Sequence, residues 1–318
     1  MGYKKEISRT INILIFCTIV FAGCKKKDDD KAITPAATTP CVAAGNSSSS
    51  TITGFDRPVG IAFSPAQKVA VTEFHGMDFD GNNYTYGQLG PVKIFLNTTN
   101  FYANTPDLTI TTTYAPEAVL FDANENLYIT ETENISGVSI YQPPYTTLLK
   151  TIQNGFQNPR GIAIDGSGNL YLAEDDLNRV LKISDPLGIE SQATFITGLS
   201  APKAIVISGN YMFIAEYTAN RVSKYNINTP ATPVETYTID QPIDLHVSGC
   251  MLYISSHGTT AGGYGTSKVV AVKMDNMAAG IQKEYTGFTG ITFGVSSDQN
   301  GNIFVSDFST GEIRKYAK

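Results

Sequence analysis

The sequence is poor in the residues that carry most catalytic and metal-binding motifs. It has no tryptophan, three histidines and four cysteines in 318 residues. It contains no Cys-x-x-Cys pair or zinc-type His/Cys spacing, and no G-x-S-x-G elbow, P-loop or dinucleotide-binding glycine pattern. Charged residues make up 16% of the chain and the formal net charge is −6, which argues against a nucleic-acid binder. The 28 glycines, 17 tyrosines and 16 phenylalanines are instead typical of a packed protein rich in strands and turns.

The first residues predict export and attachment to a membrane. Three basic residues precede the apolar run INILIFCTIVFA at 11–22, which is short for a membrane span and typical of a signal-peptide core. The residues FAGC at 21–24 resemble a bacterial lipobox, with phenylalanine where leucine is usual. The resemblance implies removal of residues 1–23 and lipidation of Cys24, where two acyl chains make a stable anchor. The alternative is an ordinary secretory signal with an incidental cysteine.

Residues 24–50 predict a flexible tether before a folded domain at 51–318. The tether begins with KKKDDD after Cys24 and continues as a Thr-, Ala- and Ser-rich stretch with too few apolar residues to pack. Lys25 stands where an aspartate often marks retention in the inner membrane. The acidic run resembles surface-export tags of some lipoproteins. We therefore expect a lipid-anchored protein of the bacterial cell envelope, in the outer membrane and exposed at the cell surface.

A repeated unit accounts for nearly all of the remaining chain. Each unit opens with an apolar strand after a proline, continues through a turn such as DGSGN, and returns in a second apolar strand that ends in an acidic residue. The opening prolines are Pro58, Pro116, Pro159, Pro202 and Pro242, and a sixth copy without proline runs from 291 to 316. The middle spacings are 43, 43 and 40 residues. Such a period with short alternating strands predicts the blades of a β-propeller.

The units resemble NHL repeats over roughly residues 55–318. The stretch GIAIDGSGNLYLAEDDLNRVLKI at 161–183 and the copy at 294–315 carry the resemblance best. It implies an all-β, six-bladed propeller, whereas WD-type blades would show Trp-Asp pairs. Internal repeats are preceded by a fourth strand, but the last repeat ends at Lys318 without one. We therefore predict that residues 51–55 pair into the last blade as its outer strand, which removes exposed sheet edges.

Two cysteines remain once the signal and the lipidated residue are set aside. Cys41 lies in the tether, and Cys250 lies at the turn between the first and second strands of blade 5. The closing strand should enter on the face that carries these turns. A Cys41–Cys250 disulfide is one expectation in an oxidising compartment, and two unpaired thiols are the other.

The ends of the second strands suggest a cation site. They align as Glu73, Glu131, Glu174, Glu216, Ser256 and Asp307. Glu174 and Glu216 each have an arginine five residues later and fit structural ion pairs. The others lack that arginine, and Glu117 should lie on the same face. Glu73, Glu117, Glu131 and Asp307 could therefore converge on calcium or magnesium, the alternative being solvated acids with local hydrogen bonds.

Ligand-binding residues are expected on the same face. Two Gly- and Tyr-rich loops rise from it, at 75–90 and 257–266, and their candidate contacts are His75, Tyr84, Tyr86, His257 and Tyr264. Arg160 and Lys203 follow opening prolines and could grip an anion, although salt bridges to Glu174 and Glu216 are favoured. His246, within a first strand, should be a core or channel residue.

Two functions follow from these features. The first is a surface-anchored, monomeric binding module whose loops take a protein, peptide or glycan, with the membrane contacted only through lipid. The second is a divalent-cation-dependent hydrolase or lyase, since six-bladed relatives include gluconolactonase-like enzymes with a channel cation. The Glu-Gly-Pro opening typical of those enzymes is absent, because blade 1 opens Arg57-Pro58-Val59-Gly60. The binding module is therefore favoured, and fold alone cannot decide between the two.

Overall fold

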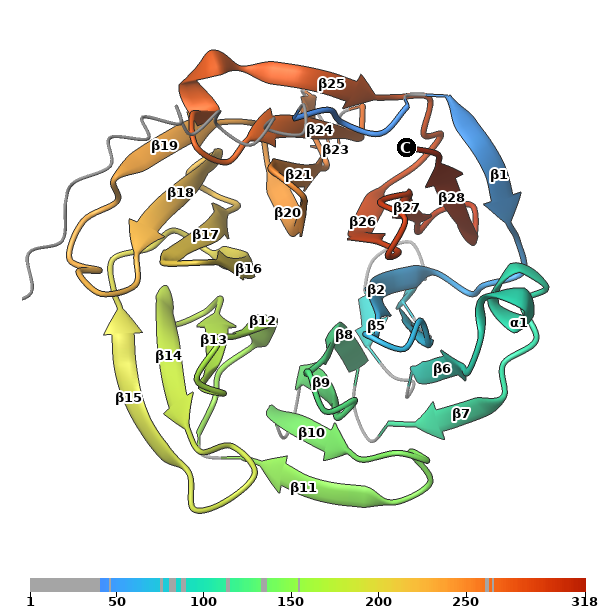
Figure 1. Ribbon diagram of the computed structural model, residues 1–318, viewed down its shortest axis with the longest axis horizontal. Coiled ribbons are helices and arrows are strands. Elements are labelled where there is room, and N and C mark those ends of the chain that lie inside the picture. The colour runs from blue at the N-terminus through green and yellow to red at the C-terminus, as the bar shows by residue number, and fades with distance from the viewer. Residues whose placement is uncertain are drawn as a thin grey trace, which may run out of the picture. The chain divides into compact units, whose positions relative to one another are not determined.

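The chain forms a ring of six antiparallel sheets. The computed structural model describes residues 41–45, 47–74, 77–79, 84–86, 90–112, 115–132, 136–153, 155–260, 263–264 and 266–318. Over these ranges six four-stranded sheets surround a central axis (Figure 1). This confirms the all-β, six-bladed propeller expected from the repeats. None of the helices in the described ranges has the length and apolar character needed to span a membrane.

The blades follow the chain in order, and each begins with its innermost strand. Blade 1 contains β2 (Pro58–Phe63), β3 (Val69–Glu73), β6 (Pro91–Phe95) and β7 (Leu108–Thr111). Blade 2 contains β8 (Ala115–Phe121), β9 (Leu127–Thr132), β10 (Gly137–Tyr141) and β11 (Leu148–Ile152). Blade 3 contains β12 (Pro159–Ile164), β13 (Leu170–Glu174), β14 (Arg179–Ser184) and β15 (Ser191–Ile196).

The second half of the ring repeats this arrangement. Blade 4 contains β16 (Pro202–Ser208), β17 (Tyr211–Glu216), β18 (Arg221–Asn226) and β19 (Glu235–Thr238). Blade 5 contains β20 (Pro242–Ser248), β21 (Met251–Ser256), β24 (Lys268–Lys273) and β25 (Ile281–Tyr285). Blade 6 contains β26 (Thr292–Ser297), β27 (Ile303–Asp307), β28 (Glu312–Tyr316) and β1 (Ser48–Ile52).

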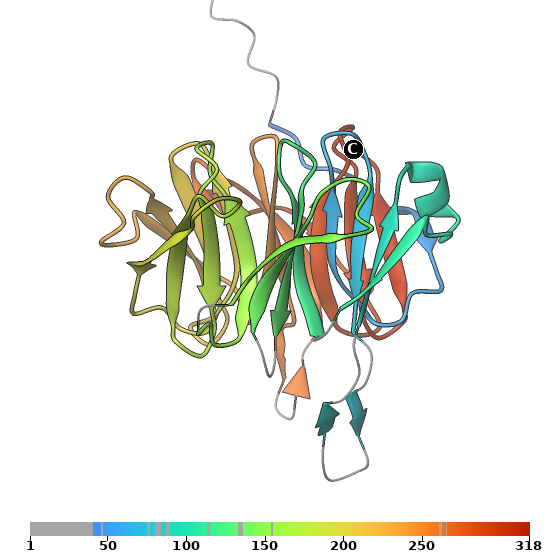
Figure 2. The same ribbon diagram turned by 90° about the horizontal axis from the view of Figure 1, so that it is seen from below.

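Two short hairpins, one short helix and one 3-10 turn lie outside the blade sheets. The hairpins β4–β5 (Met77–Phe79, Tyr84–Tyr86) and β22–β23 (Thr259–Thr260, Gly263–Tyr264) interrupt blades 1 and 5 after their second strands. The helix α1 (Thr98–Tyr102) and the turn η1 (Met277–Ala279) follow third strands. In Figure 2 the β4–β5 hairpin projects from one face of the ring, which we call the mouth face.

The opposite face carries the turns between first and second strands. In blade 3 the Asp165 carboxylate accepts the backbone N–H groups of Ser167 and Asn169, both at 2.9 Å, and the Asn169 side chain at 2.8 Å. Asp122 and Asp298 make the same contacts in blades 2 and 6. The aspartate that opens each turn motif thus accepts hydrogen bonds within the turn, as the sequence predicted.

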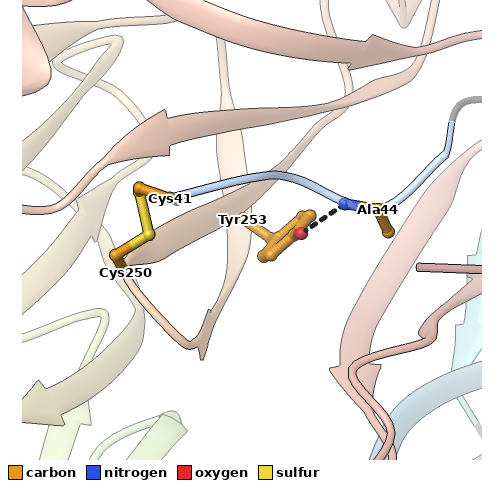
Figure 3. Close-up of a disulfide and its surroundings, with 4 residues drawn as sticks. All are labelled: Cys41, Ala44, Cys250 and Tyr253. Carbon is orange, nitrogen blue, oxygen red and sulfur yellow. Dashed lines mark hydrogen bonds between the residues drawn. A yellow bond between two sulfur atoms is a disulfide. The ribbon is translucent and has the colours of Figure 1, made fainter. Parts of the chain in front are cut away.

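The N-terminal segment closes the ring on this opposite face. β1 pairs antiparallel with β28, so the prediction of an N-terminal outer strand in the last blade is confirmed. The strand covers Ser48–Ile52 and begins three residues before the expected range of 51–55. Upstream of it, Cys41 forms a disulfide with Cys250, with 5.8 Å between the Cα atoms. The Ala44 N–H donates to the Tyr253 hydroxyl at 3.1 Å (Figure 3). Packed chain therefore begins at Cys41, upstream of the boundary expected at residue 51, because these contacts fasten it to blade 5.

Hydroxyl groups on second strands link the first strands of neighbouring blades by hydrogen bonds. Thr72 on β3 accepts the Gly60 N–H at 2.7 Å and donates to the Glu117 carbonyl of the next blade at 2.9 Å. Thr130 and Ser306 make the equivalent links to blades 3 and 1. Apolar clusters fill the space between adjacent blades, for example Tyr171 and Val180 with Ile205, Met212 and Ile214. Each blade therefore buries its faces only against its neighbours.

Candidate functional site

Two rings of side chains lie at the mouth-face end of the channel, and the inner ring lines the channel itself. The inner ring is the first residue after each opening proline, or after Thr292 in blade 6. Its members are Val59, Glu117, Arg160, Lys203, Ile243 and Phe293. The outer ring is the residue that follows each aligned second-strand position, which is an acid in five blades and Ser256 in blade 5. Its members are Phe74, Thr132, Asp175, Tyr217, His257 and Phe308. These rings are the candidate site.

Backbone hydrogen bonds fix the two rings against each other. The N–H of Phe74 donates to the Arg57 carbonyl, just before an opening proline, at 3.1 Å. The corresponding bonds in blades 3, 4, 5 and 6 come from Asp175, Tyr217, His257 and Phe308, at 2.9–3.3 Å. Arg57 has a φ of 51°, and three other residues before opening prolines share this left-handed backbone. The repeated strain shows that packing imposes the geometry of the opening.

Blades 2, 3 and 4 make one half of the opening charged. Arg160 pairs with Glu117, and its Nε atom lies 3.8 Å from an Asp175 oxygen. Lys203 pairs with the same Asp175. Burial and the neighbouring Arg160 lower the pKa of Lys203. Two acids and two bases thus form a quartet of equal and opposite charges, which replaces the expected salt bridges of Arg160 and Lys203 to Glu174 and Glu216. Asp176, which is exposed, adds a weaker electrostatic interaction with Arg160.

Blades 4, 5, 6 and 1 make the other half aromatic. The ring centroids are 5.8 Å apart for Tyr217 and His257, and 4.9 Å apart for His257 and Phe293. The row continues from Phe293 to Phe308 at 5.0 Å and from Phe308 to Phe74 at 6.3 Å. The Lys203 ammonium lies 5.5 Å from the Tyr217 ring and joins the row to the quartet. Contacting side chains therefore encircle the opening from blade 2 to blade 1.

The channel behind the opening is small. It has a volume of about 240 Å³ and is lined by the first strands of all six blades. Asp244 and His246 of β20 border it, as predicted for His246. Burial raises the pKa of Asp244 to about 7, and its Oδ2 atom accepts the Val295 N–H at 2.8 Å. Burial lowers the pKa of His246 to about 4, and its Nε2 atom lies 2.8 Å from the Ser297 hydroxyl.

The four acids proposed as cation ligands do not converge. Among the described residues no three His, Cys, Asp or Glu side chains form a group that could hold a metal ion. Glu73 accepts the Asp56 N–H at 2.9 Å and the Lys93 ammonium at 2.7 Å. Ser139 donates to Glu131, and Arg314 lies 3.2 Å from Asp307. Glu117 pairs with Arg160 in the quartet. The expectation that these acids lack partners was therefore wrong.

The partners of Glu73, Glu131 and Asp307 were missed because they lie two residues further along the third strand of the same blade. Glu174 and Glu216 pair with the arginines directly opposite, as predicted. Arg314 instead stands two residues beyond Glu312, the residue opposite Asp307, and so points to the same sheet face. Lys93 occupies the corresponding position in blade 1. In three blades the acid also accepts a loop N–H before the opening proline, as Glu216 does from Ser200 at 3.1 Å.

The predicted loop residues are only partly described. His75 lies outside the described residues, and so do Cys17 and the proposed lipidation site Cys24. Tyr84 and Tyr86 lie on β5 and Tyr264 on β23, on hairpins of the mouth face. His257 is 3% exposed and packs against Phe293, and burial lowers its pKa to about 4. It is a buried, uncharged residue packed between the Tyr217 and Phe293 rings.

The sequence carried a signal for the residues that were missed. Phe74, Asp175, Tyr217 and Phe308 each follow an aligned acid directly. Each of these second strands ends at its buried acid, so the next residue begins the connection at the mouth face. Aligning the repeats one position further would have identified the outer ring.

Comparisons with known proteins support the fold. No family model matches the sequence, and no curated protein does. A chain from the crystal structure of a nidogen/laminin complex has a TM-score of 0.58 and 14% identity, covering 75% of this chain and 84% of that one. Virginiamycin B lyase from Staphylococcus aureus has a TM-score of 0.56 and 14% identity, covering 85% and 98%. A streptogramin B lyase has a TM-score of 0.56 and 13% identity, covering 84% and 96%. At these identities the likeness establishes a six-bladed propeller.

Proposed function

We propose that this chain is a bacterial envelope lipoprotein, anchored through Cys24, whose NHL-type propeller binds a ligand at its mouth face. The observation that carries the proposal is that the N-terminal attachment and the candidate site lie on opposite faces of the ring. The N-terminal segment is fastened to the face opposite the mouth by Cys41–Cys250. Both hairpins project from the mouth face (Figure 2). The inner ring lines the channel, and backbone hydrogen bonds hold the outer ring beside it. A ligand site opposite the attachment point suits a tethered receptor.

The alternative enzyme needs carboxylate oxygens that are available to a cation. Glu73, Glu131 and Asp307 instead accept hydrogen bonds from residues of their own blades. The resemblance to two lyases is one of fold, and a streptogramin-like substrate is not implied for this chain. Binding is therefore the function that the arrangement supports best.

The anchor is tested by metabolic labelling with palmitate. The full-length chain should be labelled and should enter the detergent phase on phase partition. The Cys24→Ala variant should be unlabelled and aqueous, while Cys17→Ala should behave like the unaltered chain. An unlabelled chain, or label retained by Cys24→Ala, would rule out the lipoprotein.

The binding role is tested by a thermal-shift screen of the full-length chain with oligosaccharides, short peptides and small carboxylates. At least one class should raise the melting temperature, and Phe293→Ala should abolish that shift. The control is Tyr211→Ala, which removes a 39% exposed ring at the start of β17, on the other face. If none of the three classes binds, or if binding survives Phe293→Ala and fails in the control, the mouth is not a binding site.

A further inference from the structure

The charge balance of the opening restricts its ligand. Glu117 and Asp175 are matched by Arg160 and Lys203 within one connected group. The exposed fractions of these four side chains lie between 11% and 26%, so all are partly sheltered from water. An anionic ligand would have to displace a carboxylate, and a cationic ligand would have to displace a base. Both exchanges lose an ion pair that is already formed, so the quartet favours an uncharged partner.

The quartet nevertheless offers many hydrogen-bonding atoms at fixed positions. A guanidinium carries five N–H donors in a plane, and each carboxylate offers two acceptor oxygens. Donors and acceptors alternate along Glu117, Arg160, Asp175 and Lys203. Hydroxyl groups on adjacent carbons both donate and accept, so such a strip matches them without a change of charge.

The aromatic row supplies the complementary surface across the opening. Phe293 and Phe308 are half-buried, with centroids 5.0 Å apart, and His257 beside them is uncharged. A flat ligand whose faces bear C–H groups can lie against these rings while its edge carries hydroxyls. The channel of about 240 Å³ is below the roughly 300–1,000 Å³ typical of drug-sized pockets, so it takes one ring-sized unit.

We propose that the opening binds an uncharged sugar ring, the terminal unit of a neutral glycan, between Phe293 and the Arg160–Asp175 strip. This inference rests on the proposed function and specifies its ligand class. The carbon face of the sugar stacks on the aromatic row, and its hydroxyls replace water at the quartet. A peptide is the competing outcome of the test.

The test is native affinity electrophoresis of the full-length chain in a detergent without a sugar headgroup. The gels contain mixed-linkage β-glucan, galactomannan or arabinoxylan as neutral probes, and polygalacturonate as the anionic probe. At least one neutral polysaccharide should retard the chain, and polygalacturonate should not. Phe293→Ala should weaken the binding about tenfold, the loss of one stacking contact, while Phe293→Tyr keeps it. Arg160→Met should weaken it as well.

Two controls separate the opening from the rest of the surface. Tyr211→Ala removes an aromatic ring on the other face, and Lys150→Met removes a base that pairs with Glu190 away from the channel. Both should bind like the unaltered chain. Circular dichroism checks the fold, and Phe308→Ala replaces Phe293→Ala if that variant does not fold.

The outcomes distinguish this inference from the proposed function. If no neutral polysaccharide retards the chain, or polygalacturonate retards it more, the sugar proposal falls. If a peptide from the thermal-shift screen then binds in a Phe293-dependent way, the binding module stands with another ligand. If the controls weaken sugar binding as much as Phe293→Ala does, the site is elsewhere and the sugar proposal falls as well.

Discussion

One step along the chain separates structural residues from site residues in this protein. Glu174 is fully buried and accepts the Gln157 N–H and the Arg179 guanidinium. Asp175, the next residue, belongs to the charged quartet at the channel opening. The end of β13 separates these roles, because Glu174 is its last residue and Asp175 begins the turn that follows. The aligned acids are therefore part of the scaffold, and the chemistry of the opening lies beside them.

The Glu73→Gln substitution tests this scaffold role. Glu73 is 1% exposed and accepts hydrogen bonds from the Lys93 ammonium and the Asp56 N–H. Removing its charge leaves Lys93 without its ion pair, so urea denaturation should show a free energy of unfolding lower by about 1–3 kcal/mol. Glu312→Gln, whose side chain is 28% exposed beside Arg314, should change it by less than about 0.5 kcal/mol. Stabilisation of the unaltered chain by calcium, lost in Glu73→Gln, would contradict the scaffold role and restore the cation site.

Asp244 should make stability depend on pH. Its pKa is about 7 in the folded chain, because of burial, against an ordinary value of 3.8. The folded state therefore holds this proton more tightly, and the associated stability is present at low pH and is lost as pH rises from about 4 through 7. We expect the unfolding free energy of Asp244→Asn, relative to that of the unaltered chain, to rise by on the order of 2 kcal/mol from pH 5 to pH 8. Urea denaturation at each pH measures this difference. His246 titrates identically in both proteins and cancels. Parallel profiles would show that Asp244 is not the responsible group.

At the scale of elements, the N-terminal segment acts as both strand and clasp. β1 covers the edge of β28, and the Cys41–Cys250 bond joins residues that are 209 apart in the sequence. Tyr285 donates to the Ala44 carbonyl at 2.9 Å, and Gly45 donates to the Ala317 carbonyl at 2.6 Å. The segment therefore ties blade 5 to the end of blade 6.

Replacing both cysteines tests the clasp. The Cys41→Ser, Cys250→Ser variant should lose about 2–5 kcal/mol of unfolding free energy, because a long loop in the unfolded chain is no longer constrained. Dithiothreitol should destabilise the unaltered chain by the same amount and leave the double variant unchanged. Equal stability of the oxidised chain and the double variant, measured in urea, would show that the bond contributes nothing.

At the scale of the whole molecule, ring closure makes the six blades interdependent. Apolar clusters lie between neighbouring blades, and the seam between blades 6 and 1 includes Ile52 of β1 with Phe55, Phe95, Phe101 and Phe304. Every blade thus needs two neighbours to bury its faces. A break at the seam should weaken the entire propeller.

Deleting residues 1–52 tests this interdependence. The deletion removes both β1 and the Cys41–Cys250 bond, uncovers the β28 edge and opens one seam. The midpoint of urea denaturation should therefore fall below that of the Cys41→Ser, Cys250→Ser variant, and the chain should self-associate. Deleting residues 1–40 keeps Cys41 and β1, and this control should unfold like the full chain without its lipid. The comparison needs circular dichroism and analytical ultracentrifugation. An unchanged midpoint without residues 41–52 would show that the ring does not need its closing strand.

The amino-acid sequence by itself determined the blade count, the strand order and the closure, because these follow from local periodicity and a repeated proline that starts first strands. Pro58, Pro159, Pro202 and Pro242 each begin a strand, and Pro116 is the second residue of one. Only the tertiary structure decided which charges meet. Arg160 reaches Glu117 of the preceding blade and Lys203 reaches Asp175 of the preceding blade. Such pairs form across blades, where the curvature of the ring and not distance along the chain brings side chains together.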